Sequence, residues 1–135
     1  MEWDAANRIA HVSYVDVHID CDEAYQAWSD RLFREFDRVK RVAKGKFALV
    51  VCVDELYLSR KVSERYGAEL ARRVADEYAT VIARYGAQRP MTKAVIAVEA
   101  MRRSLASPTD DLRLHGANLF RTRDEAIAFV REGGA

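Results

Sequence analysis

Hydrophobic residues recur every three or four positions in three segments, and each segment is predicted to be an amphipathic helix. In the first segment, between Asp22 and Ala43, the apolar positions are Tyr25, Trp28, Leu32, Phe36, Val39 and Ala43. A second stripe predicts a long helix over residues 63–85. In the third segment, Thr122 and Glu125 have the spacing of a capping box, which places the start of a final helix there.

Continuous or alternating apolar runs predict strands between these helices. Residues 47–53 and 91–98 are almost entirely apolar, as in parallel strands covered by helices, so we expect them to be buried neighbours. Residues 9–19 are rich in β-branched side chains, but the apolar parity changes near Tyr14, which predicts a bulge or register change. Glu2–Asp4 is expected to be the first arm of an N-terminal hairpin.

The order of these segments defines an α/β fold. Gly45 and Gly86 each follow a helical pattern and are predicted to end a helix. With a short helix after Pro108 and a short strand at residues 118–121, the predicted order is β-β-α-β-α-β-α-β-α. We expect a single domain over residues 1–135, with a central mixed sheet of four to five strands and an N-terminal hairpin.

Composition narrows the classes of partner. A chain of 135 residues can bury a core without a metal or a disulfide. The net charge of +1 gives no general attraction to nucleic acid or to anionic membranes. No apolar run approaches the roughly 20 residues of a membrane span, and the first residues do not resemble a signal peptide, so we expect a cytoplasmic location. Cys21 and Cys52 lack CxxC spacing and are expected to be inert thiols.

Acidic residues at a strand end are the first candidates for chemistry. Asp54 and Glu55 follow the predicted strand at residues 47–53, and ligands of open α/β sheets bind at the carboxyl ends of strands. Asp20 and Asp22 form a second acidic group that partly matches receiver domains and haloacid-dehalogenase-type phosphatases. The hydroxyl, lysine and Gly-Thr positions of those patterns are missing. We therefore expect Asp20 or Asp22 to cap the first helix.

No other motif supports an enzyme. His11, His18 and His115 lack the spacing of metal ligands, and the chain has neither a GxSxG elbow nor a Gly-rich phosphate loop. We predict no catalytic residue, no metal and no cofactor. An enzyme of unknown type that uses Asp54 is the third interpretation.

The second half of the chain resembles a known family. Residues Glu99-Ala100-Met101-Arg102-Arg103-Ser104-Leu105 have the pattern E-x-x-R-R-x-L. Gly116 and a short strand follow, and then an acidic helix start at Glu125-Ala126. Residues 47–133 look like a STAS domain, the fold of sulfate transporter tails and anti-sigma factor antagonists. The resemblance implies a STAS-like domain of the bacterial cytoplasm that acts by binding a protein.

The resemblance also points to a phosphorylation site. In anti-sigma factor antagonists a serine at a helix start, preceded by aspartate, is phosphorylated, and the added charge breaks the partner interface. Here Ser63 lies near the expected helix start, although Val62 precedes it. Ser63 and Ser59 are the candidate phospho-acceptors. The alternative is that one of them is simply the N-cap of the helix.

We therefore predict a non-enzymatic regulatory or protein-interaction module. Its predicted binding edge consists of Asp54, Glu55, Tyr57, Arg60 and Arg65. Its partner is expected to be another protein or a second copy of the chain, and neither nucleic acid nor a membrane. The alternative is a carrier of a small apolar or nucleotide ligand, which a large pocket lined by Trp28, Tyr57 and Tyr66 would favour.

Overall fold

A computed structural model describes residues 1–86 and 118–132, and this part of the chain forms an α/β fold. Its helices are α1 (Asp22–Ala43), α2 (Arg60–Glu77) and α4 (Arg123–Arg131). Its strands are β1 (Glu2–Asp4), β2 (Ile9–Val12), β3 (Val17–Ile19), β4 (Phe47–Cys52), β5 (Leu56–Leu58), β6 (Ala79–Tyr85) and β7 (Leu119–Phe120). None of these helices is long and apolar enough to cross a membrane.

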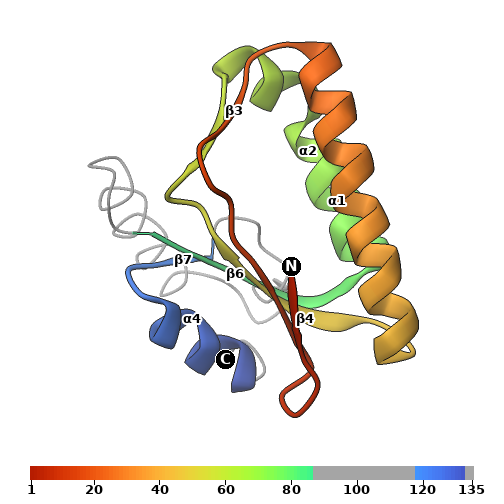
Figure 1. Ribbon diagram of the computed structural model, residues 1–135. Coiled ribbons are helices and arrows are strands. Elements are labelled where there is room, and N and C mark those ends of the chain that lie inside the picture. The colour runs from red at the N-terminus through yellow and green to blue at the C-terminus, as the bar shows by residue number, and fades with distance from the viewer. Residues whose placement is uncertain (87–117, 133–135) are drawn as a thin grey trace, which may run out of the picture.

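Five of the strands form a mixed sheet in the order β1-β2-β4-β6-β7. β1 and β2 are an antiparallel hairpin, and the other neighbours in the sheet are parallel. The predicted hairpin, mixed sheet and α/β class are therefore confirmed. Figure 1 shows α1 and α2 on one side of this sheet and α4 on the other.

The alternation of side chains along the strands explains the two helical layers. Leu49 of β4 belongs to a buried cluster with Phe36 of α1 and Val74 of α2, which we call the helix–sheet core. Its neighbour Val50 points to the opposite face and packs in a cluster with Phe129 of α4. Because both faces of β4 are covered, the strand is apolar at consecutive positions, as parallel strands usually are.

The chain leaves the main sheet twice at corresponding points. After β2, Asp16 adopts a positive φ of 50°, and β3 then pairs in parallel with β5 in a separate two-stranded sheet. Val12 pairs with Val51 in the main sheet, and Val17 pairs with Leu56 in the small one. The two interruptions are thus equal in length. The strand predicted at residues 9–19, with a bulge or register change near Tyr14, is instead two strands that belong to different sheets.

The helix predicted over residues 63–85 is wrong at both ends. α2 begins at Arg60 and ends at Glu77, and Ala79–Tyr85 is strand β6. Gly86 therefore follows a strand and not a helix. The apolar spacing of this segment fits a helix, but residues 80–82 are consecutive β-branched residues that favour a strand. Pairing along the whole length of β4 decides the outcome.

The first helix has the predicted bounds but not the predicted caps. Its N-cap residue is Cys21, and no side chain caps it, so the expectation that Asp20 or Asp22 caps this helix is wrong. At the other end Lys44, with φ of 57°, is the left-handed residue, and Gly45 follows it with φ of 147°.

The remaining predicted termini agree with the structure. The Thr122 hydroxyl accepts a hydrogen bond of 3.2 Å from the backbone N–H of Glu125, as the capping-box spacing predicts. The short strand predicted at residues 118–121 is β7. The predicted strand at residues 91–98, the helix after Pro108 and the STAS-like pattern at residues 99–105 lie outside the described residues. The two neighbours of β4 are β2 and β6, so the expectation that the strand at residues 47–53 pairs with residues 91–98 is wrong.

Candidate functional site

An apolar cavity of about 270 Å³ lies between the sheet and helices α1 and α2. We call it the helix–sheet cavity. Leu49 and Val51 of β4 and Val53, which directly follows the strand, line it from the sheet, because alternate side chains of an extended chain share a face. Trp28 and Phe36 line it from α1. Val51 and Val53 are only half-buried, so the cavity leaves apolar surface in contact with water.

Small residues on α2 keep the cavity open. Ser63, Gly67 and Ala71 follow one another at every fourth position, so they share one face of the helix, and all three line the cavity. A Cβ atom built on Gly67 would have no heavy atom within 4 Å. Ser63 and Ala71 are exposed, which places the mouth of the cavity beside this helix.

Two packed cores hold the walls of the cavity in place. The helix–sheet core lies at one end. At the other end a second buried cluster, the β3–β5 core, consists of Ile19, Tyr25, Trp28 and Val62. Leu32 of α1 and Leu70 of α2 pack against both cores and also line the cavity. Since its walls are fixed on both sides, the cavity is formed before any ligand arrives.

Tyr14 and Trp28 separate this cavity from a second hollow of about 170 Å³. Their ring centroids are 6.0 Å apart, and both residues line both spaces. Burial raises the pKa of the Tyr14 phenol, so its side chain is neutral at physiological pH. The two rings therefore form an uncharged wall at this side of the cavity.

A single cationic side chain lines the helix–sheet cavity among the residues that the structure describes. Arg84 of β6 lies on the same face as Ile82, opposite Val51 of β4, and is half-buried. Its backbone N–H donates to the Asn118 carbonyl at 2.7 Å. The fully buried Asn118 amide in turn donates to the Ile82 carbonyl at 3.2 Å. These bonds fix the carboxyl end of β6, and with it the position of the Arg84 Cα.

The structure places Asp54 of the predicted binding edge after the carboxyl end of β4, as expected, and also beside the carboxyl end of β6, which was predicted as helix. Its side chain is half-buried against Gly86, where an added Cβ would lie 2.5 Å from Asp54 Oδ1. Glu55 is exposed, and its carbonyl accepts a bond from the Val17 N–H at 2.8 Å. Asp54 therefore has a packing role in the strand ends, and Glu55 helps to join β5 to β3.

The other members of the predicted binding edge have different neighbours. Tyr57 is 46% exposed, and its ring lies 5.7 Å from that of His18. Arg65 donates to Asp22 at 2.6 Å, which links the second turn of α2 to the first turn of α1. Arg60 pairs with Glu64 on the surface of α2 at 2.8 Å. Because Arg60 and Arg65 each pair with an acid of this chain, this surface is mixed in charge and not basic.

The two candidate phospho-acceptors differ in role. The Ser59 hydroxyl accepts a bond of 3.2 Å from the Val62 N–H, so Ser59 is the N-cap of α2, as the alternative proposed. Ser63 lies in the first turn of α2 with its side chain exposed at the mouth of the cavity.

Of the three aromatic residues expected to line a ligand pocket, only Trp28 lines the helix–sheet cavity. Tyr66 stacks on Tyr25 with ring centroids 4.0 Å apart. Tyr57 does not line the cavity either. Tyr14, Gly67 and Arg84 also line the cavity and were not predicted as site residues from the sequence. A charged residue inside an apolar strand and a glycine inside a helix were the available signals for the last two.

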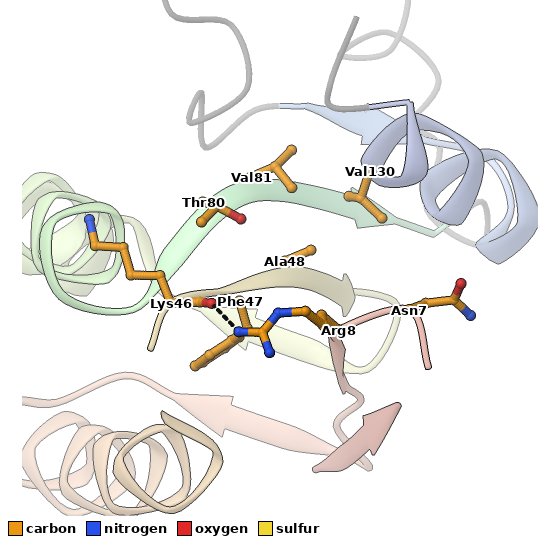
Figure 2. Close-up of a pocket in the computed structure, with 8 residues that line it drawn as sticks. All are labelled: Asn7, Arg8, Lys46, Phe47, Ala48, Thr80, Val81 and Val130. Carbon is orange, nitrogen blue, oxygen red and sulfur yellow. Dashed lines mark hydrogen bonds between the residues drawn. The ribbon is translucent and has the colours of Figure 1, made fainter. Parts of the chain in front are cut away.

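A separate pocket of about 260 Å³, distinct from the two spaces described above, lies at the amino ends of β4 and β6 (Figure 2). The Arg8 guanidinium donates to the Lys46 carbonyl at 3.2 Å, and the Lys46 ammonium group donates to the Ala75 carbonyl at 3.1 Å. Figure 2 shows the Lys46 side chain extending away from Arg8. Both cations thus bond to backbone carbonyls, and they do not converge on a common site.

The described residues do not form a metal centre. Within residues 1–86 and 118–132, no group of three or more His, Cys, Asp and Glu side chains is placed to hold an ion. His11 lies 3.5 Å from an Arg123 nitrogen, and burial together with that positive charge lowers the pKa of His11.

Comparisons with protein-family models, with curated proteins and with solved structures give no match for this chain. The STAS resemblance therefore stays a prediction from the sequence.

Proposed function

We propose that this chain is a non-enzymatic domain that binds a small apolar ligand in the helix–sheet cavity. The observation that supports it is a cavity of about 270 Å³ with predominantly apolar walls and few polar groups, which is typical of sites for small ligands. This proposal corresponds to the alternative function predicted from the sequence, a carrier of a small ligand.

The free energy of ligand binding comes from the apolar residues in the cavity walls that are incompletely buried. Val51, Val53 and Leu56 face the cavity and are half-buried, so water contacts apolar surface there. An apolar ligand that displaces this water gains about 0.8 kcal/mol for each CH₂ group that it buries. Because the walls are held by two packed cores, little of this gain is lost in ordering the protein.

The test is a substitution on α2 that fills the cavity with a larger side chain. Gly67→Leu places a side chain into the open space beside Gly67, and we expect it to abolish binding of 1-octanol measured by isothermal titration calorimetry. Ala68→Leu is the matched control, because Ala68 is the adjacent exposed residue and does not line the cavity. Circular dichroism checks that both variants fold. Failure of the parent protein to bind both 1-octanol and octanoate, or unchanged binding by Gly67→Leu, would contradict the proposal.

A protein-interaction module is the second candidate, and exposed apolar side chains favour it. Val15 is 80% exposed and Tyr57 is 46% exposed, and both lie in or beside the small β3–β5 sheet. If this surface binds a protein, Val15→Ser with Tyr57→Ser should lose a partner that the parent captures from a host lysate. Equal capture by the parent and the variant would argue against this surface.

A further inference from the structure

The helix–sheet cavity has a charged side and an apolar side. Arg84 carries the only charge among the lining residues that the structure describes. The Tyr14 and Trp28 rings line the cavity from the connection between β2 and β3 and from α1. A ligand that matches both sides has a single anionic group and an apolar remainder.

The sheet register gives the distance between the two sides. Arg84 is paired with Val51, and Val51 is paired with Val12, two residues before Tyr14. Two strand spacings therefore separate Arg84 from the β2 side, which is about 10 Å. An extended saturated chain advances roughly 1.3 Å for each C–C bond of about 1.5 Å, so about eight bonds cover this distance.

The volume of the helix–sheet cavity indicates a ligand of the same size. Water occupies about 30 Å³ per molecule in the liquid, so a cavity of about 270 Å³ has room for roughly nine groups of that size. A carboxylate with six to eight carbon atoms has about that number of non-hydrogen atoms.

We infer that the ligand is an aliphatic monocarboxylate of about six to eight carbon atoms, with its carboxylate at Arg84 and its tail ending at the Tyr14–Trp28 pair. This inference rests on the proposed function and names the ligand class. A guanidinium suits a carboxylate because its N–H groups form parallel, charge-assisted hydrogen bonds to both oxygens. Its five donors allow it to bond to more than one acceptor at a time.

Tyr14 determines the length of the tail that the cavity accepts. The second hollow, of about 170 Å³, lies beyond the Tyr14–Trp28 pair and shares Leu32 with the helix–sheet cavity. Trp28 is buried in the β3–β5 core, whereas Tyr14 is half-buried in the irregular connection between β2 and β3. Tyr14 packs against the helix–sheet core and the β3–β5 core from their margins and lines both spaces. Removing its ring therefore joins the two spaces while the fully buried residues of both cores stay in place.

The first experiment separates the charge from the tail. Isothermal titration calorimetry measures the affinity of the parent protein for the even-numbered carboxylates from butanoate to dodecanoate, and for 1-octanol. We expect the tightest binding for hexanoate or octanoate, and octanoate should bind about 10- to 100-fold tighter than 1-octanol. Arg84→Met should remove this preference for octanoate and leave the affinity for 1-octanol within about threefold.

The outcomes of this experiment distinguish the two proposals. If the parent binds 1-octanol as tightly as octanoate, the carboxylate assignment is wrong and the proposed function stands. If it binds neither, both are wrong. The comparison of the two ligands on the parent protein decides this even if Arg84→Met does not fold.

The second experiment tests the length determinant. Tyr14→Ala should move the tightest binding from hexanoate or octanoate to decanoate or dodecanoate. Tyr57→Ala is the control, since Tyr57 is exposed on the small sheet and does not line the cavity. A folded Tyr14→Ala protein that keeps the parent's preference would show that the ring pair is not the end of the site.

Discussion

Gly67 is a glycine in the middle of a helix, and the structure shows no packing reason for it. A Cβ atom at this position would meet no heavy atom within 4 Å, and the residue is flanked by more than one helical turn on each side. Gly67→Ala therefore adds a methyl group without a clash and removes the conformational freedom of glycine from the unfolded chain. We expect a gain of about 0.5–1 kcal/mol in the free energy of unfolding. For a chain of 135 residues this raises Tm by about 3 °C.

Urea denaturation followed by circular dichroism measures this gain in the absence of ligand. Ala68→Gly is the control, because it makes the reverse change at the next, exposed position of α2 and should lower the free energy of unfolding by a similar amount. A Gly67→Ala protein that is less stable than the parent would refute the reasoning. It would mean that another group approaches the backbone at this position and that the cavity beside it is not open.

Three further predictions concern other positions. Gly86→Ala should destabilise the fold by about 1–3 kcal/mol in urea denaturation, because the new Cβ would lie 2.5 Å from Asp54 Oδ1; unchanged stability would contradict that contact. Ser59→Ala should cost about 1 kcal/mol through loss of the α2 cap, whereas Ser63→Ala should change stability by less than about 0.5 kcal/mol, and equal effects would contradict the assignment of the cap. Burial and a hydrogen bond to a carboxylate raise the pKa of Tyr78 to about 12, so the neutral phenol stabilises the fold below pH 10 and this contribution is lost as the pH rises towards 12. The stability difference between the parent and Tyr78→Phe should shrink over that range, and a constant difference would contradict the shift.

Long, regular patterns predicted their elements well. The first helix has the predicted bounds, Asp22 to Ala43, because its apolar stripe is consistent over many turns. The prediction for the segment after Glu77 was wrong because its apolar pattern fits both a helix and a strand. Tyr78, Val81, Ile82 and Tyr85 have helical spacing, yet Tyr78 is the C-cap of α2 and the other three lie in strand β6, which pairs with β4. That pairing is non-local, so a local pattern does not contain it.

The cavity could not be predicted from the sequence for a similar reason. Its lining comes from α1, α2, three strands and the connection between β2 and β3, and the chain order does not bring these segments together. Two local features were informative in retrospect. Ser63, Gly67 and Ala71 place small side chains on one face of α2, and Arg84 interrupts an otherwise apolar strand. The predicted binding edge followed from strand ends alone, and the structure gives its members different neighbours.

The equal length of the two interruptions ties together two parts of the chain that are distant in sequence. β3 and β5 keep the register of β2 and β4 only because the same number of residues separates Val12 from Val17 and Val51 from Leu56. A one-residue deletion between β2 and β3 would shift β3 against β5 and turn Ile19 away from the β3–β5 core, and one between β4 and β5 would do the same to Leu56 and Leu58. A second deletion in the other connection would restore the pairing. Insertions and deletions in these two connections are therefore tolerated as matched pairs and not singly.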